Sequence, residues 1–588
     1  MNKKTKHSIA IEGASVKTTQ SNSRKKILSH MLMLISMLVI CFACNKIVDD
    51  IIDGEDIVDG EDVIDGVKCS ELGMIPNDET QGTNNRKILI NALNDGINIL
   101  IDNKYYLTGL GTPAIIDSDI VIAGVTDNAE FSFTKTTMTG SNFLKIESQN
   151  FLMRKVKLTS IQNEYVYAFR FSDTHKMKDF SVEKCYFEGS VRLMNWAFTN
   201  NVYPNPDEYD YGIENFKFAG NTCNNISTTF IAIANVPTKH SQITGNEVRN
   251  FKNIFYNQEI TNVNIHVDKL APKISFLEVK DNTVINDISW DGKEQGRNHM
   301  YHCFIFFEGD KCEYKNNHIE GLHIFDEDIN VYDAYLSCIN LEYENNFWKN
   351  NIVFNSDPGF DSKGRQMMKC KDSPRLDGYK NIKRVCRNNT FIVEKSYADN
   401  WGRPYDELWV KIIEFDNDME TVVVDNNKID VYILRLNTAD VKTHNFTFIN
   451  NDIHAVKTRN SSSNCVLPVT AKIDDGIHGT YIARKNKIVI DEPGSSPGTN
   501  NSLIRYTFPN GNIDHTKVIF EDNYVKWPDM STIIRSAYTI TIGNVPIDIS
   551  ITNNTVITET EPIQISGIRG ATIDLSSNTF IATSGSGQ

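Results

Sequence analysis

The sequence predicts an all-β chain wound into a single long solenoid, and three observations support this fold class. The chain has 588 residues, which is more than one compact core requires. A triplet of Asn, any residue and an apolar residue recurs along the chain, flanked by alternating apolar and polar residues. One amphipathic helix pattern precedes these repeats, and the repeats themselves show strand rather than helix periodicity. Together these features predict strands that stack coil upon coil.

The first residues have the pattern of a bacterial signal peptide. Residues 1–43 contain seven Lys or Arg and one acidic residue, and residues 31–43 are almost entirely apolar. That apolar stretch is too short to cross a bilayer but has the length of a signal-peptide core. The tetrapeptide CFAC at 41–44 resembles the lipobox of bacterial lipoproteins, although it has Cys where Leu is usual. The resemblance implies cleavage before Cys44 and two acyl chains at that residue, whereas the alternative is an ordinary secretory signal.

Residues 44–75 are predicted to form a flexible acidic tether. Three similar six-residue units, IIDGED, IVDGED and VIDGVK, fill residues 51–68, and like charges in such a run keep a chain extended. The alternative is a calcium site, but the acidic spacing is not that of an EF-hand loop. Acidic residues behind a lipidated cysteine resemble the export tag of surface lipoproteins in Gram-negative bacteria. The resemblance implies an outer-membrane protein exposed at the cell surface, with the lipid anchor as its membrane contact.

Charge and cysteine content exclude two classes of function. The net charge is −15 and the leader is basic, so the rest of the chain is more acidic still, which argues against a nucleic-acid partner. The nine cysteines that follow Cys44 are scattered and contain no C-x-x-C pair. They predict neither a zinc site nor a disulfide framework, and several lie in apolar runs where a thiol packs as a small hydrophobe.

Residues 83–96 carry the helix pattern. Four apolar residues share one face of this segment: Ile88, Leu89, Ala92 and Leu93. We expect Thr83 or Asn84 to cap the start of the helix and Gly96 to end it. A helix at this position would cover the open end of the first coil, which otherwise exposes strand edges.

The repeated asparagine marks one position in each predicted coil. The repeats fall at Asn221, Asn246, Asn282, Asn317, Asn345, Asn389, Asn427, Asn451, Asn486, Asn523, Asn554 and Asn578, with earlier echoes at Val156 and Cys185. Successive asparagines lie 24 to 44 residues apart, so the coil has a constant minimum and variable insertions. We expect each asparagine to occupy a sharp bend with a left-handed backbone and to bond its amide along a ladder. The apolar residue two positions later is expected to face the core.

Residues 76–588, with their strand–Asn–strand cadence and leading helix, resemble the right-handed parallel β-helix of the pectate-lyase-like superfamily. The resemblance implies one β-helix domain whose substrates lie along an outer sheet face, under loops from the longest coils. The signature motifs of pectate lyases, of polygalacturonase-type hydrolases and of chondroitinase-B-like lyases are not found. The resemblance therefore concerns the fold, and function needs its own evidence.

Two loops contain residues that a polysaccharide lyase would need. A lyase needs a base beside the uronate carboxylate and a cation that neutralises it. Residues 289–303 gather candidates for the base: Lys293, Arg297, His299 and His302. The next coil offers oxygen ligands for calcium, a possible cofactor: Asp326, Glu327, Asp328 and Asp333. The alternative is that these are ordinary polar loop residues.

Basic and aromatic side chains are the candidates for substrate binding. Residues 361–387 hold nine Lys or Arg and three Asp inside an acidic protein, so they are suited to a polyanion or are simply a solvated loop. The representative cations are Lys369, Lys371 and Arg375. Three tryptophans from other loops could stack on sugars or pack on their own coil: Trp196, Trp401 and Trp409.

The sequence therefore predicts a surface lipoprotein that binds an acidic polysaccharide. Cleavage is left open, with elimination favoured over hydrolysis. The alternative is a non-catalytic glycan-binding protein or adhesin, and a purely structural display role is the third hypothesis.

Overall fold

The computed structural model describes residues 64–583 except for short segments, and those from Asp65 onward belong to one compact unit. The excepted segments are 110–111, 136–140, 161–165, 172–175, 198–211, 227–228, 235–237, 259–275, 288–300, 323–329, 351–365, 371–382, 395–410, 416–417, 435–441, 459–464, 472–478, 494–500, 508–516, 542–547, 560–561 and 570–571. The predicted signal peptide, Cys44 and residues 44–63 of the predicted tether lie outside the described residues. Within the described part, no helix is long and apolar enough to cross a membrane.

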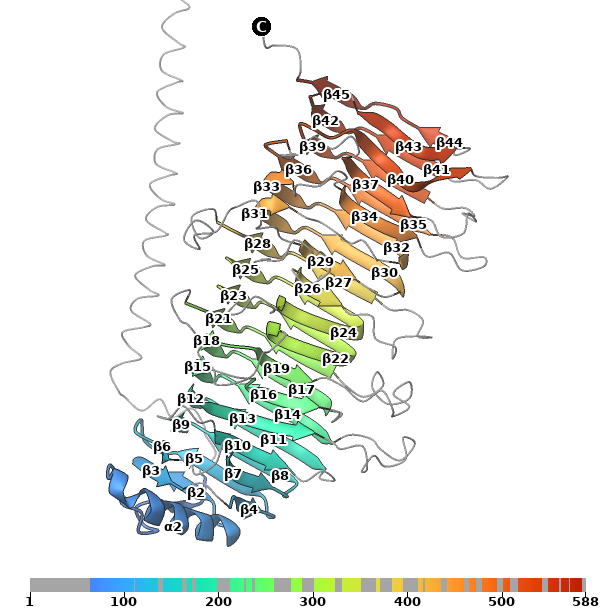
Figure 1. Ribbon diagram of the computed structural model, residues 1–588. Helices are drawn as coiled ribbons and strands as arrows, with labels where there is room; N and C mark the ends of the chain where they lie inside the picture. Colours follow the sequence, from blue (N-terminus) through green and yellow to red (C-terminus); the bar gives the residue numbers. More distant parts are fainter. Residues whose placement is uncertain are drawn as a thin grey trace, which may run out of the picture. The chain divides into compact units, whose positions relative to one another are not determined.

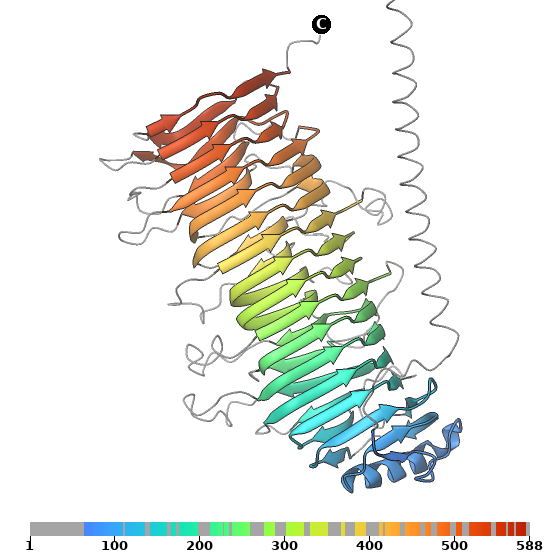
Figure 2. The same ribbon diagram turned by 180° about the vertical axis from the view of Figure 1, so that it is seen from behind.

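The unit is a parallel β-helix, in which strands of successive coils stack above one another (Figure 1). Each coil contributes one strand to each of three rows, so that β8, β9 and β10 form one coil and β11 begins the next by pairing with β8. Neighbouring strands run parallel, with Phe216 of β14 opposite Ser241 of β17, for example. Figure 2 shows the same stacking from behind. The predicted fold class is confirmed.

Two of the three rows are joined into a 29-stranded sheet. The first row consists of β1 (Val67–Lys68), β2 (Ile99–Ile101), β5 (Ile120–Gly124), β8 (Asn150–Arg154), β11 (Met177–Glu183), β14 (Ile213–Ala219), β17 (Thr238–Thr244), β20 (Phe276–Lys280), β27 (Lys383–Arg387), β30 (Asp418–Asp425), β32 (Lys442–Ile449), β35 (Thr480–Arg484), β38 (Lys517–Glu521), β41 (Asp548–Thr552) and β44 (Thr572–Asp574). The second row consists of β4 (Ala114–Ile116), β7 (Ser141–Ile146), β10 (Val166–Phe171), β13 (Val191–Ala197), β16 (Ile231–Ala234), β19 (Ile254–Gln258), β26 (Gln366–Cys370), β29 (Lys411–Phe415), β34 (Cys465–Ala471), β37 (Ser502–Thr507), β40 (Thr532–Thr541) and β43 (Ile563–Arg569). Strands β22 (Tyr301–Lys315) and β24 (Asn330–Glu344) pass through both rows and so connect them.

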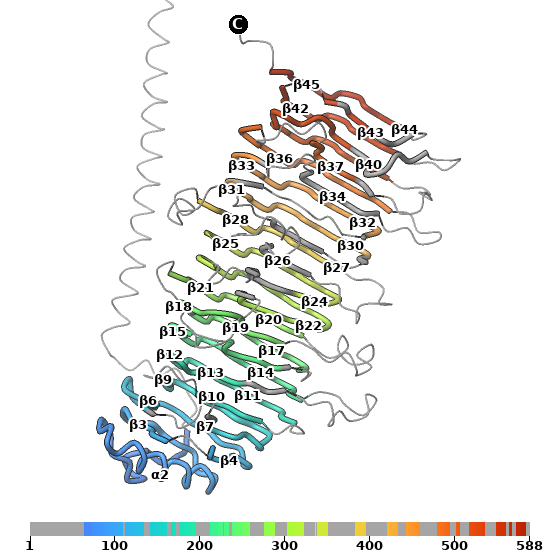
Figure 3. The backbone as a smooth tube through the Cα atoms, viewed as in Figure 1, coloured from blue at the N-terminus to red at the C-terminus, as the bar shows by residue number. Residues whose placement is uncertain are grey.

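The third row is a separate 16-stranded sheet of short strands. It consists of β3 (Lys104–Thr108), β6 (Glu130–Lys135), β9 (Lys157–Ser160), β12 (Tyr186–Gly189), β15 (Thr222–Ile226), β18 (Glu247–Phe251), β21 (Thr283–Ile285), β23 (His318–Glu320), β25 (Phe347–Lys349), β28 (Thr390–Ile392), β31 (Lys428–Leu434), β33 (Asp452–Thr458), β36 (Lys487–Ile490), β39 (Tyr524–Lys526), β42 (Thr555–Thr558) and β45 (Thr579–Ala582). The tube in Figure 3 shows how tightly the chain turns from the first row into these strands.

The helix covers the first coils, as predicted, but its start differs from the prediction. Helix α2 spans Gly82–Asn94, and its residues Leu89, Ala92 and Leu93 are buried against the β-helix. Neither Thr83 nor Asn84 caps it, because the short 3-10 helix η1 (Glu79–Gln81) runs directly into it and makes Gln81 the first flanking residue. Gly96 ends the helix as predicted, with a φ of 72° and its N–H bonded to the carbonyl of Leu93.

The ordered unit also begins earlier than the predicted domain boundary at residue 76. Strand β1 pairs with β2, with Val67 opposite Ile99, and Cys69 behind it is fully buried. Residues 65–75 are therefore part of the β-helix unit rather than of the tether. Only the last unit of the repeat, VIDGVK, reaches into this part, and its resemblance to the two units before it conceals the strand that begins at Val67.

A ladder of buried asparagines runs along the corner between the first row and the short strands. Each backbone N–H and each side-chain Nδ2 donates to the Oδ1 of the asparagine in the next coil, over N–Oδ1 distances of 2.8–3.1 Å. The second Nδ2 hydrogen points to a strand carbonyl, as from Asn246 to Phe218 and from Asn427 to Cys386. The amide thus uses its full donor and acceptor capacity. The predicted ladder is confirmed at Asn221, Asn246, Asn282, Asn317, Asn389, Asn427, Asn451, Asn486, Asn523, Asn554 and Asn578.

Two details of the ladder prediction are wrong. The member between Asn317 and Asn389 is Asn346 and not Asn345, since Asn346 receives the bond from Asn317 and donates to Asn389. The left-handed backbone belongs to the residue before each ladder asparagine, with φ of 51° to 63° from Lys155 to Ser577. That residue is at the turn, whereas the ladder asparagine already begins the next strand. In the earlier coils, Val156 and Cys185 occupy the ladder position, and the N–H of Cys185 bonds to Asn221.

We predict that Asn427→Leu lowers the free energy of unfolding by about 3 kcal/mol or more. The change removes the acceptor of two buried donors on Asn389 and the donor to the carbonyl of Cys386, and each buried polar group left unpaired costs roughly 1–3 kcal/mol. The matched control is Asn426→Gly, one residue earlier, which keeps the positive φ and is expected to cost less than about 1 kcal/mol. Denaturant midpoints followed by circular dichroism compare the two. Equal losses in both variants would contradict the assigned role of the ladder.

Candidate functional site

Most of the predicted site residues lie outside the residues that the structure describes. These are Lys293, Arg297, His299, Asp326, Glu327, Asp328, Lys371, Arg375, Trp401 and Trp409. Four others lie in described strands: Trp196 in β13, His302 in β22, Asp333 in β24 and Lys369 in β26. Strand pairing places His302 opposite Val331 and Lys369 opposite Tyr335, so His302, Asp333 and Lys369 belong to three successive strands of the second row. The register staggers them along these strands: Asp333 lies two residues beyond the position opposite His302, and Lys369 pairs two residues further on, at Tyr335.

The described basic residues at the end of the predicted stretch 361–387 lie in different environments. Lys383 is exposed, whereas Arg384 is fully buried inside the solenoid. Arg387 lies on the outer face within 3.5 Å of carboxylate oxygens of Glu344 and Asp425. Arg384 and Arg387 therefore do not form a free basic surface with Lys383.

The described residues include most of the cysteines and some of the predicted calcium ligands. The seven cysteines whose side chains are described are all buried. Among the described residues, no group of three or more His, Cys, Asp or Glu side chains is arranged to hold a metal ion. Of the predicted calcium ligands, Asp333 has its backbone in that part and the others lie beyond it.

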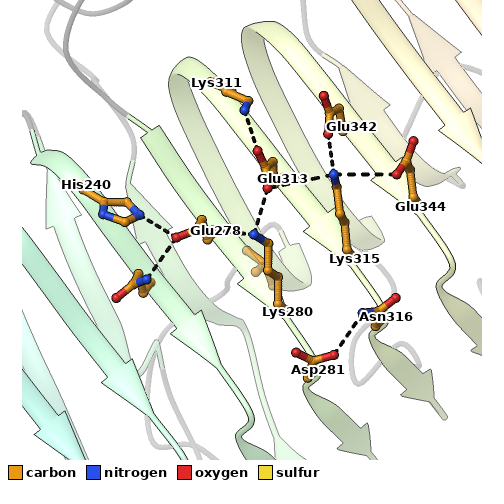
Figure 4. A network of polar contacts seen from close by, with 12 residues as sticks. His240, Glu278, Lys280, Asp281, Lys311, Glu313, Lys315, Asn316, Glu342 and Glu344 are labelled. Atoms are coloured by element: carbon orange, nitrogen blue, oxygen red, sulfur yellow. Dashed lines mark hydrogen bonds and ion pairs between the residues drawn. The ribbon is translucent and has the colours of Figure 1, made fainter.

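The outer face of the first row carries a network of lysines and glutamates that crosses four coils (Figure 4). Lys280 contacts Glu278 on its own strand and Glu313 on the next strand, the latter at 2.8 Å. Lys315 contacts Glu342 and lies 3.6 Å from Glu344, both on β24. Each lysine thus joins carboxylates of adjacent coils.

His240 and Gln242 extend this network by one strand. The Nε2 of His240 lies 2.6 Å from Glu278, and the side-chain amide of Gln242 donates to the same carboxylate at 3.0 Å. The ring of His240 is stacked on Phe276, with 4.9 Å between ring centroids. On the following strand, the Nζ of Lys311 also lies over the Phe276 ring, 4.9 Å from its centroid.

The electrostatics of the network keep its acids ionised and its bases protonated. Burial alone would raise the pKa of Glu313, but hydrogen bonds from Lys280 and Lys311 outweigh it and lower the pKa to about 2. The pKa of Glu278 is lowered in the same way, against burial, chiefly by Lys280. The pKa of Lys315 is raised by Glu342 and Glu313 despite burial. Groups shifted in these directions hold strands together and are poor general acids or bases near neutral pH.

The outer face of the 16-stranded sheet, called the short-strand face below, is described in every coil. One side chain per strand forms a column along it, and the next residue of each strand points inward. The column consists of Lys104, Glu130, Lys157, Tyr186, Thr222, Glu247, Thr283, His318, Phe347, Thr390, Lys428, Asp452, Lys487, Tyr524, Thr555 and Thr579. At about 4.8 Å per strand this column extends for about 70 Å.

Aromatic rings on the short-strand face stand beside polar groups that can bind hydroxyls. The rings of His318 and Phe347 are 4.8 Å apart on adjacent strands. Glu320 and Lys349 lie next to them and are 3.4 Å apart, and Lys349 also lies 3.5 Å from Glu394. These five residues are called the His318–Phe347 cluster. The charge of Glu320 raises the pKa of Lys349.

Two more ring sites lie on the same face. The hydroxyl of Tyr186 donates to Glu188 at 2.8 Å and accepts from Asn224 at 3.0 Å. Tyr524 is 38% exposed, one of the most exposed large apolar side chains among the described residues. The face therefore offers ring surfaces at intervals along its length.

A histidine joins three coils near Tyr524. His454 of β33 lies 2.8 Å from Asp430 through Nδ1 and 2.9 Å from Asp491 through Nε2. Because both nitrogens face carboxylates, the protonated ring is favoured, and the hydrogen bonds to Asp430 and Asp491 raise the pKa of His454. His454 lowers the pKa of Asp491 in return.

Comparison with protein-family models, with curated proteins and with solved structures finds no match for this chain. The function must therefore be argued from the faces just described.

These two faces were not predicted, although the repeat carries a signal for the short-strand face. In the triplet of Asn, any residue and an apolar residue, the middle residue is the one that forms the column on the short-strand face. Reading the middle residues in order yields the sequence of the column from Thr222 onward. The lysine–glutamate network had a weaker signal, since Glu-x-Lys alternation also occurs on many exposed strands.

We predict that Lys315→Met destabilises the protein more than Lys311→Met does. Lys315 separates carboxylates on two adjacent strands, whereas Lys311 lies at the edge of the network beside Glu313. We expect a loss of about 1 kcal/mol for Lys315→Met at low salt, and less at high salt because of screening. Unfolding midpoints at two salt concentrations test this. An equal loss from Lys311→Met would contradict the bridging role.

We predict that the stabilisation by His454 depends on pH. Its folded pKa is raised above the ordinary 6.5, so its contribution is fully present below 6.5 and is lost as the pH rises through the folded pKa. The destabilisation caused by His454→Gln should therefore shrink between about pH 6 and pH 9. Thermal midpoints across this range measure it.

The control for this prediction is Lys487→Gln, which removes another cross-coil pair of the same face, 3.2 Å from Asp452. Its effect should stay constant over the same range, because lysine and aspartate side chains do not ordinarily titrate there. A pH-independent effect of His454→Gln would contradict the stabilising role of the hydrogen bonds from protonated His454 to Asp430 and Asp491.

Proposed function

We propose that this protein is a lipid-anchored cell-surface protein that binds a polysaccharide along its short-strand face. The observation that carries the proposal is the column of one outward side chain per coil, in which the rings of Tyr186, His318, Phe347 and Tyr524 are interspersed among hydrogen-bonding groups. A linear polymer can contact many equally spaced groups at once, and weak contacts then add up through their high effective concentration. Rings pack on the apolar C–H faces of sugars, and carboxylates, amides and amines bind their hydroxyls.

The surface location rests on the lipobox-like CFAC segment and the acidic repeat behind it, which lie ahead of the described unit. A long solenoid on an extended tether is suited to reach a polymer outside the cell. We also infer kinship with the pectate-lyase-like superfamily, supported by the parallel stacking and by the N-terminal helix α2. Cleavage of an acidic polysaccharide by elimination stays a prediction that rests on Lys293, Arg297, His299 and His302.

We predict that Phe347→Ala weakens polysaccharide binding about tenfold, which corresponds to about 1.4 kcal/mol for the loss of one ring contact. The matched control is Phe276→Ala, because Phe276 is also paired with a histidine and a lysine but lies on the first-row face. Binding of the full chain to a panel of neutral and uronate polysaccharides is measured by affinity electrophoresis. Equal losses in both variants, or no binding to any member of the panel, would contradict the proposal.

The same incubations separate binding from cleavage. New unsaturated sugar ends absorb ultraviolet light, so a rising absorbance with a uronate polymer would support the lyase prediction. Binding without such a rise supports the glycan-binding protein or adhesin.

A further inference from the structure

A fully buried arginine lies inside the solenoid, between apolar residues of the two adjacent coils. Arg384 of β27 is 0% exposed and ranks among the largest fully buried side chains of the described unit. Its neighbours in the adjacent coils are Leu341 of β24 and Val422 of β30, both buried. The side chain therefore occupies a position that the neighbouring coils fill with apolar residues.

Half of the guanidinium is satisfied by main-chain oxygens. The Nη1 of Arg384 donates to the carbonyl of Ile339 at 2.8 Å and to the carbonyl of Lys383 at 3.2 Å. The other edge, formed by Nε and Nη2, is buried and has no hydrogen-bond partner among the described residues. These two nitrogens form the side of the fork that binds planar or spherical anions with two parallel hydrogen bonds.

The acidic residue Asp310 does not neutralise this edge directly. Asp310 lies at the bend of β22, where strand pairing places it beside Ile339. No hydrogen bond or ion pair joins Asp310 to Arg384 among the described residues. Burial raises the pKa of the nearby Cys338 thiol to about 11, and there the charges of Arg384 and Asp310 act in opposite directions.

Elementary electrostatics requires a counter-charge at this place. A guanidinium stays protonated at every accessible pH, so it cannot escape the cost of burial by losing its proton. A buried charge without a partner strongly disfavours the folded state. We propose that Arg384 binds a small monovalent anion of the halide class on its Nε–Nη2 edge, inside the solenoid between β24 and β27. Full burial excludes a polysaccharide carboxylate, so this site is separate from the short-strand face.

The bound anion acts as an internal structural element rather than as a substrate. It neutralises Arg384 next to the corner where β24 passes from the second row to the first. Since the anion binds the folded chain and not the unfolded chain, each tenfold rise in free anion above its Kd should raise the folding equilibrium constant about tenfold.

The test uses the full chain and two matched variants. Wild type and Arg387→Met should gain in unfolding midpoint when chloride replaces gluconate at constant ionic strength, because Arg387 lies on the outer face of the same strand. Arg384→Met should fold and show no such gain, since an apolar side chain of similar length suits its surroundings. A chloride effect of equal size in Arg384→Met would overturn the proposal.

A second measurement does not depend on the variants folding. Crystals of the wild-type chain soaked in bromide should show an anomalous peak within hydrogen-bond distance of Nε and Nη2 of Arg384. The absence of that peak would overturn the proposal. So would a loss of stability in Asp310→Asn together with no halide dependence in the wild type, because Asp310 would then be the counter-charge.

Discussion

The structure depends on one constraint, the tight corner at which every coil turns from the first row into the short-strand sheet. A coil can stack on the next one only if each corner turns in the same way and leaves no buried polar group unpaired. The asparagine ladder meets both conditions, because each amide receives two hydrogen bonds from one neighbouring coil and donates to both. The residue before it takes the left-handed backbone at the surface. Coil after coil is thereby held in register.

The regular corner has a consequence for the surface. Since the strand begins at the same residue after each ladder asparagine, the next residue always points outward and the one after it always points inward. The outward residues therefore form straight columns, and the chain can choose each one freely without disturbing the core. This freedom explains how threonines, charges and rings come to occur in one column along the short-strand face. On the first-row face, the side chains of neighbouring coils are aligned in the same way. There the aligned lysines and glutamates form ion pairs that join one coil to the next.

Much of the fold could be predicted from the sequence, because the repeat is local. Period-two alternation around a fixed asparagine predicts strands and corners without knowledge of any long-range contact. The errors arose where two adjacent residues were both asparagine, as at Asn345 and Asn346, and where capping depended on η1 preceding α2. Much less of the candidate site could be predicted. Charged and aromatic loop residues such as Lys293 and Trp401 are compatible with many arrangements, and a loop composition does not say which side chains meet.

Spacing and polarity along the chain are enough to predict a parallel solenoid with a recurrent asparagine at its corners and a helix before its first coils. Only the tertiary structure decided which outward residues become neighbours, because residues 24 to 43 positions apart meet through strand pairing. It alone decided that Arg384, one cation in a basic stretch, lies inside the solenoid while Arg387 lies outside. Side chains three residues apart on a strand point to opposite faces, which accounts for this difference. Which of the two faces the core, however, is fixed by the strand's register with the neighbouring coils.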